Sequence, residues 1–94
     1  MTDRRDSAHV LAIKALGWLA ARDDLFEAFL ANSGASASDV RENAASPAFL
    51  CGALDFVLMQ DQWVLDCAGA LAIEPQSLVE ARAILGGGDM RHWT

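Results

Sequence analysis

Helix start and stop signals divide this chain into short segments and leave little sequence that could form a sheet. Ser36 and Asp39 have the spacing of a capping box. Ser46 followed by Pro47 combines a hydroxyl cap with proline at the first helical position. The sequence contains no Asn-Gly or Asp-Gly hairpin dipeptide and no sustained alternation of apolar and polar residues. The pattern therefore predicts an all-α fold, a compact bundle of five to six short helices in a single domain.

The predicted helices follow one another with only short turns between them. They cover residues 6–21, 24–32, 37–45, 47–58, 62–72 and 75–85. We expect Gly34 to end the second helix in the left-handed conformation, Asp61 to cap the fifth and Pro75 to begin the sixth. The whole chain, residues 1–94, is then one domain with an ordered core of about residues 6–85 and a tail, 86–94, tethered by glycines.

The first predicted helix is apolar on nearly every side. Its large apolar residues are Val10, Leu11, Ile13, Leu16, Trp18 and Leu19. Lys14 is the lone charge in its middle, and a helix of this kind is either central in the fold or partly covered by a second molecule. The segment 47–58 has a broad apolar arc that leaves Asp55 nearly alone on the other side, so we expect it at the centre of the core.

The remaining helices carry narrower sets of residues for burial. These are Leu25, Phe26, Phe29 and Leu30 in the second, Val40 and Ala44 in the third, Trp63, Val64, Cys67, Ala68 and Leu71 in the fifth, and Leu78, Val79 and Leu85 in the sixth. A chain of 94 residues has little apolar area to spare, so we expect these sets to face one shared core.

The charge of the chain argues against nucleic acid as a partner. The formal net charge is −6 at pH 7, and the 7 Lys and Arg residues are scattered. Nucleic acid and anionic membrane surfaces both attract clustered positive charge. Residues 69–85 have the pattern of two helices joined by a tight turn, but the outer face of the second offers Gln76, Glu80 and Arg82 where a recognition helix needs a basic surface. We expect no nucleic acid and no membrane as partner.

The N-terminal region lacks the features of a signal peptide or a membrane span. Lys14 interrupts the first apolar segment, and Arg22 and Asp23 follow it directly. No apolar run approaches the roughly 20 residues that cross a bilayer. We therefore expect a cytoplasmic protein, in which Cys51 and Cys67 stay reduced.

Two cysteines and two histidines raise the question of a metal or redox site. They are Cys51, Cys67, His9 and His92. Zinc ligands usually include pairs about two to four residues apart, and none of these four residues has such a partner. Cysteine is also commonly buried as a small apolar group. We expect no metal and no cofactor.

Asp55, Asp61 and Asp66 are the carboxylates to consider for acid–base chemistry. Asp55 and Asp66 belong to different predicted helices, Asp61 is more simply a helix cap, and no histidine, tyrosine or lysine is tied to the three by spacing. A carboxylate as close to a core as Asp55 either reaches water or accepts a hydrogen bond from a donor such as Arg22, Arg41 or Trp63. We assign no catalytic residue and expect no enzyme activity.

The C-terminal tail is less polar than most tails. Beyond Gly86–Gly88 it carries Met90, His92 and Trp93. Trp93 either folds back into a groove of its own domain or anchors a partner, because buried tryptophans are frequent interface hot spots.

The order of several segments resembles a known family. "LGWLA", "FLANSGAS" with "DVRENA", "PAFLCGALDFVLMQDQWV" and the ending "GGGDMRHWT" together resemble the domain-of-unknown-function family 3572, short proteins of alphaproteobacteria. The resemblance covers essentially the whole chain and implies a small, helical, cytoplasmic bacterial protein. It brings no assigned activity, and so no catalytic residues.

These observations favour a non-enzymatic interaction module that presents an apolar groove or patch to another protein or to a second copy of itself. The candidate contact residues are Trp18, Trp63, His92 and Trp93. The alternative is a small-ligand-binding protein or enzyme that uses Asp55 in a pocket between the fourth and fifth helices, near Trp63. The second alternative, a nucleic-acid-associated regulator, would need a basic face built from Arg4, Arg5, Lys14, Arg22 and Arg41.

Overall fold

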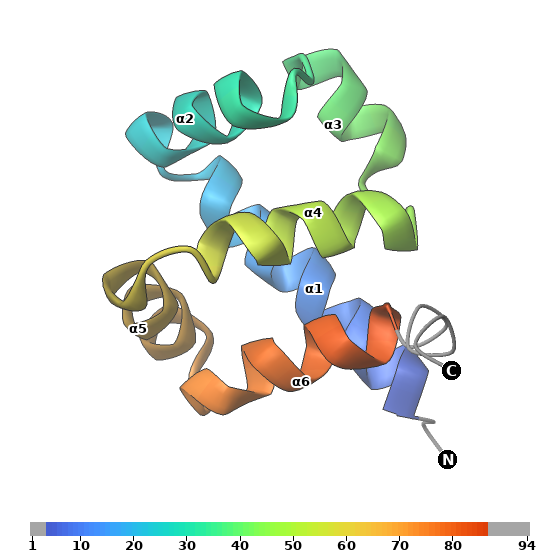
Figure 1. Cartoon of the computed structure of the whole chain (residues 1–94), viewed down its shortest axis with the longest axis vertical. Coiled ribbons are helices and arrows are strands. Elements are labelled where there is room, and N and C mark those ends of the chain that lie inside the picture. The colour runs from blue at the N-terminus through green and yellow to red at the C-terminus, as the bar shows by residue number, and fades with distance from the viewer. Residues whose placement is uncertain (1–3, 87–94) are drawn as a thin grey trace, which may run out of the picture.

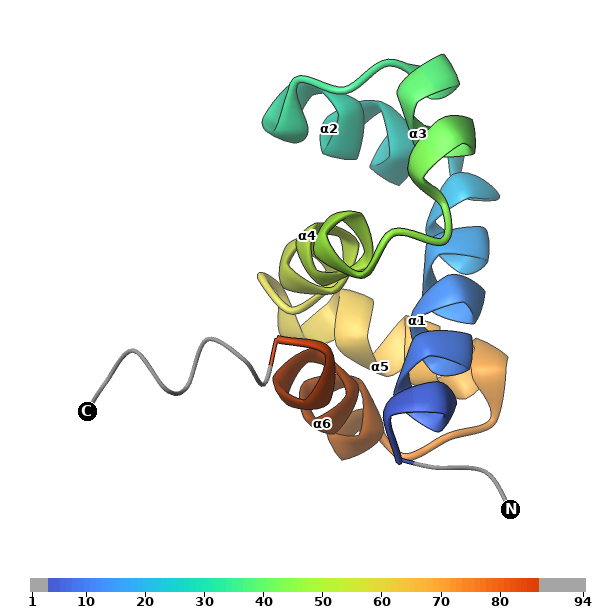
Figure 2. The same cartoon turned by 90° about the vertical axis from the view of Figure 1, so that its right-hand side faces the viewer.

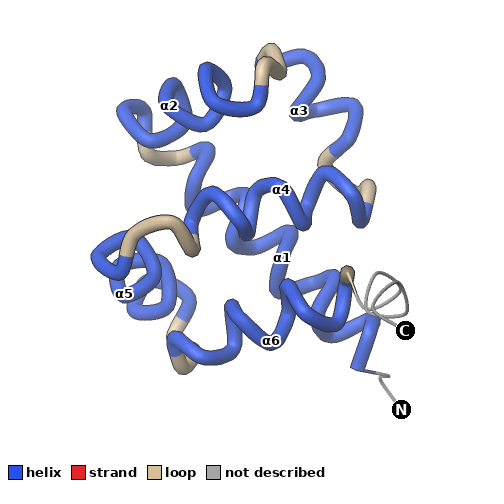
Figure 3. Tube along the Cα trace, viewed as in Figure 1, coloured by secondary structure: helices blue, strands red, loops and turns tan. Residues whose placement is uncertain are grey.

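The computed structural model of the chain describes residues 4–86. Its six helices are α1 (Arg4–Ala20), α2 (Asp23–Ser33), α3 (Ala37–Asn43), α4 (Pro47–Val57), α5 (Asp61–Leu71) and α6 (Pro75–Leu85). Helices and short turns make up this described part of the chain, which contains no strand (Figure 3). The predicted all-α bundle is confirmed.

Helix α1 is the helix around which most of the others are packed. It runs along one side, with α2 and α3 near its C-terminal end, α5 and α6 toward its N-terminal end, and α4 crossing between them (Figures 1 and 2). It contacts α2, α4, α5 and α6. The fold therefore gives this helix the central position, yet one side of it stays open: Val10 is 51 % exposed and Ile13 is 41 % exposed.

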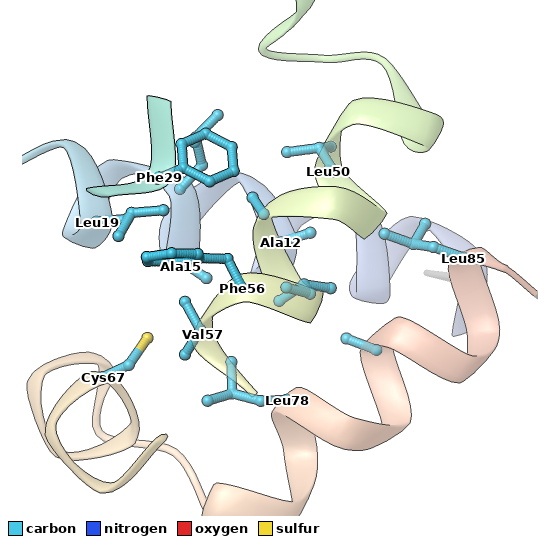
Figure 4. Packing of buried hydrophobic residues seen from close by; sticks show 14 of the residues in the cluster. Ala12, Ala15, Leu19, Phe29, Leu50, Phe56, Val57, Cys67, Leu78 and Leu85 are labelled. Atoms are coloured by element: carbon cyan, nitrogen blue, oxygen red, sulfur yellow. The ribbon is translucent and has the colours of Figure 1, made fainter. Parts of the chain in front are cut away.

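Small side chains make much of the contact between α1 and its neighbours. The buried residues of α1 are Ala8, Ala12, Ala15, Leu16 and Leu19. Ala12 and Ala15 are at most 1 % exposed, and they lie opposite α4 in the middle of the packed cluster (Figure 4). Short side chains at such a seam allow the two helix axes to approach closely. The large residues that dominate the sequence pattern of this helix therefore do not by themselves define its buried face.

Helix α4 lies at the centre of the core, as predicted. Its buried residues are Leu50, Ala53, Leu54, Phe56 and Val57. Phe29 of α2 meets Phe56 edge to face, with ring centroids 5.5 Å apart (Figure 4). On its other side Phe56 stacks on Trp63 of α5 at 4.9 Å. Aromatic pairs of this kind add about 0.5–1.5 kcal/mol beyond the area they bury, and here they connect α2, α4 and α5.

Most of the local start and stop signals act as predicted. The Ser36 backbone N–H donates to the Asp39 carboxylate at 2.9 Å, and the Asp39 backbone N–H donates to the Ser36 hydroxyl at 3.1 Å, which completes the capping box. The Ser46 hydroxyl accepts a hydrogen bond from the backbone N–H of Phe49 at 3.4 Å. Gly34 ends α2 with a φ of 77°, the left-handed conformation that glycine adopts without a Cβ penalty.

The structure corrects two local predictions. Gln60, not Asp61, occupies the cap position of α5, and its side chain makes no capping hydrogen bond. Asp61 is instead the first helical residue, where its charge faces the positive end of the helix dipole. Val79 is 52 % exposed, because it points about 100° away from the face that Leu78 and Ala81 bury.

Candidate functional site

Asp55, the polar residue that the sequence singled out, is held by an arginine of α6. The Arg82 Nε–H donates to the Asp55 carboxylate at 2.7 Å. The donor is therefore Arg82, and not Arg22, Arg41 or Trp63, the examples named from the sequence. The two side chains are 56 % and 31 % exposed for Asp55 and Arg82, and an ion pair in water of this kind contributes about 0–1 kcal/mol. The pair joins α4 to α6 across the surface of the core.

A hollow does border Asp55, but it lies between α2 and α4. It measures about 310 Å³ and is lined by Phe29, Asn32, Ser33, Gly52, Asp55, Phe56 and Met59. A pocket between the fourth and fifth helices stays a prediction; where these helices meet, the ring of Trp63 stacks on Phe56 with centroids 4.9 Å apart. Asp55 is the single titratable group among the lining residues, and it is already paired. The hollow therefore lacks a second group for acid–base chemistry.

The two tryptophans of the described chain are partly buried and pack against the core. Trp63 is half-buried against Phe56. Trp18 is also half-buried, and the Arg22 guanidinium lies 5.3 Å from its ring centroid, within range of a cation–π contact. The other two candidate contact residues, His92 and Trp93, lie outside the described residues.

A second apolar surface follows α1, and the sequence did not predict its far wall. Two adjoining hollows of about 370 Å³ and about 260 Å³ share Ser7 and Leu11. The larger is lined by Ser7, Val10, Leu11, Lys14, Leu71 and Ile73, and the smaller by Arg4, Ser7, Ala8, Leu11, Ser77, Glu80, Ala81 and Ile84. We call the two together the α1 groove. The sequence placed Leu71 on the apolar face of the fifth helix and gave Ile73 no role, because their position beside α1 depends on tertiary packing.

The basic residues of the described chain are distributed over several helices. Arg4 and Lys14 line different hollows of the α1 groove. Arg22 lies over Trp18. Arg41 belongs to α3, at the opposite end of the molecule from the first turn of α1 (Figure 1).

The cysteines lie in or beside the core. Cys67 is buried and Cys51 is half-buried, and they do not form a disulfide with each other. In the described part of the chain no three His, Cys, Asp or Glu residues come together as a metal site would require. Burial raises the pKa of the Cys67 thiol to about 11 from an ordinary value of 9.0, because the thiolate loses its hydration.

The raised pKa predicts slow thiol chemistry. We expect Cys67 in a Cys51→Ser variant at pH 8 to react with a disulfide reagent at least ~100-fold more slowly in the native protein than in denaturant, since two pKa units lower the thiolate fraction by that factor. The stabilising effect of the neutral thiol should be complete below about pH 9 and decline as the pH rises toward 11. Equal labelling rates in native and unfolded protein would show that Cys67 is not buried.

No single helix of the described chain is both long and apolar enough to cross a bilayer. Helices α4 and α5 meet the requirements only when they are taken together, and the chain bends by 116° between them. Leu54, Val57 and Cys67 of this pair are buried against the other helices.

Fold and surface together define a small α-helical protein with an exposed apolar groove along its central helix. Residues 5–88 match the family described as protein of unknown function DUF3572, and the chain belongs to that family. Comparisons with curated proteins and with solved structures gave no match.

Proposed function

We propose that this protein is a non-enzymatic interaction module that binds another protein through the α1 groove. The observation that carries the proposal is the exposure of Val10, at 51 %, on the wall of a hollow of about 370 Å³ that Leu71 and Ile73 also line. Ile13 of the same helix is 41 % exposed outside that lining and extends the exposed apolar surface of α1. Exposed apolar area costs about 25 cal/mol per Å² relative to burial. Contiguous apolar surface with polar edges is the usual mark of a protein-binding site.

The groove supports binding better than catalysis. Its titratable lining residues are Arg4, Lys14 and Glu80, and each reaches solvent from a helix surface. They stand around apolar side chains, as polar groups do at the rim of a protein interface. A site of this composition can recognise shape and charge.

Two polar replacements on α1 test the proposal. We expect Val10→Gln with Ile13→Gln to lower affinity capture of a partner by the full-length chain at least tenfold, because the two side chains supply the apolar contact that a partner would bury. Glutamine keeps a high helix propensity, so circular dichroism should show an intact fold. The matched control is Leu65→Gln on the outer face of α5, where the leucine is 55 % exposed.

A third variant tests the alternative site, the hollow beside Asp55, independently of the α1 groove. Met59→Gln alters the hollow beside Asp55 and leaves α1 unchanged. Capture that survives the double replacement on α1 but is lost with Met59→Gln would refute the α1 groove and assign the binding site to the hollow beside Asp55. Concentration-dependent dimerisation abolished by the double replacement would identify the partner as a second copy.

A further inference from the structure

We propose that the segment bound in the α1 groove is an amphipathic α-helix that carries carboxylates beside its apolar face, and that Lys14 recognises those carboxylates. The inference rests on the proposed function and adds the chemical class of the partner. It follows from three features: the length of the groove, the helical secondary structure of its walls, and the distribution of charged residues around it.

The spacing of the lining residues along α1 and the length of the groove suit the binding of a helix. Ser7, Leu11 and Lys14 follow one another along α1 at helical spacing. From Arg4 to Lys14 the groove extends about 15 Å at roughly 1.5 Å per residue, which matches about three turns of a partner helix. A helix bound in a groove of this length would present anchors at i, i+3, i+4 and i+7.

The backbone around the groove excludes the other common mode of peptide binding. An extended peptide gains affinity by pairing its backbone with the free edge of a sheet. The described chain consists of helices and turns, and the groove walls are α1, the end of α5 and α6, so no strand edge borders the groove in the described residues. A bound segment must therefore satisfy its own backbone hydrogen bonds, and an α-helix does so.

The charges on α1 favour an acidic partner. Lys14 is the charged lining residue of the larger hollow, and Arg4 lies at the far end of the smaller one. Among the described residues neither Lys14 nor Arg4 has an ion-pair partner. Glu80 on the α6 wall of the smaller hollow has the opposite charge, so the carboxylates of the partner should face α1.

The rest of the surface strengthens this preference. The chain has a net charge of −6, and α2 alone carries Asp23, Asp24 and Glu27. Acidic segments are repelled elsewhere and attracted to α1, which gives both orientation and a faster encounter.

A displayed peptide library tests the inference without a known partner. The library consists of 14-residue helices with leucine at i, i+3, i+4 and i+7 and with Glu, Gln or Lys at the flanking positions, selected on the full-length protein. We expect enrichment of Glu beside the leucines. Affinity for a selected helix should fall about tenfold with Lys14→Glu, and should return when the flanking Glu of the peptide is changed to Lys.

Arg41→Glu is the control, because it makes the same charge change on α3 at the far end of the molecule (Figure 1). Selected helices without charge preference that still require Val10 and Ile13 would overturn the acidic-partner inference and leave the proposed function standing. The absence of both an enriched helix and a dimer, or binding unaffected by Val10→Gln with Ile13→Gln, would overturn both. A dimer that the same double replacement dissolves, with no enriched helix, would assign the groove to a second copy and also refute the inference.

Discussion

Replacement of Leu54 by alanine should lower the free energy of unfolding by about 2–5 kcal/mol. Leu54 is fully buried in the middle of α4, the helix that packs against α1, α2, α5 and α6. The variant loses the transfer free energy of the removed atoms and leaves a cavity that rigid neighbouring helices fill only in part. For a domain of this size the melting temperature should fall by roughly 10–30 °C.

The matched control for this change is Leu65→Ala on α5. Leu65 is 55 % exposed, so its truncation should change the free energy of unfolding by less than about 0.5 kcal/mol. Urea titration followed by circular dichroism measures both variants. Equal destabilisation of the two would contradict the packing of α4 at the centre of the core.

The second large effect is expected from a larger side chain at Ala12, where α1 packs closely against its neighbours. Ala12→Leu should destabilise the fold by about 1–3 kcal/mol or more, because Ala12 is 0 % exposed and has no room for a longer side chain. Leucine and alanine are both good helix formers, so the change would not act through helix propensity.

Ala20→Leu is the control for this replacement, since Ala20 lies exposed at the end of the same helix. It should leave the melting temperature almost unchanged. If Ala12→Leu were equally harmless, the seam between α1 and its neighbours would be looser than the structure has it.

The helix signals were predictable because they act over a few residues. The capping box at Ser36 and the left-handed turn at Gly34 are decided by hydrogen bonds and sterics within one turn of the chain. Asp61 was assigned one position wrongly for the same reason: either Gln60 or Asp61 can precede the first turn, and the tertiary path of the α4–α5 connection makes the choice.

The buried face of α1 could not be predicted from its pattern. Large apolar residues occur all round this helix, so its sequence carries no preferred direction. The seam at Ala12 and Ala15 follows from where α4 and α6 cross, and these contacts join residues far apart in the chain. Val10 and Ile13 are left exposed for that reason.

The candidate site was predictable only in part. Asp55 was singled out from the sequence, but its partner Arg82 comes from a helix distant in sequence, and the Asp55 side chain is 56 % exposed. Trp63 was expected at a pocket wall, and in the structure it is half-buried and stacks on Phe56 at the edge of the core. The far wall of the α1 groove, at Leu71 and Ile73, likewise depends on the crossing of α5 over α1.

The central claim is that partners bind along α1, and an NMR titration tests it most directly. The full-length ¹⁵N-labelled protein would be titrated with a helix selected on it, and amide shift changes followed for each residue. We expect the largest changes at Val10, Leu11 and Lys14, with further changes at Leu71 and Ile73. Changes concentrated instead on the α2–α4 hollow, at residues 32, 52 and 59, would contradict the proposed site.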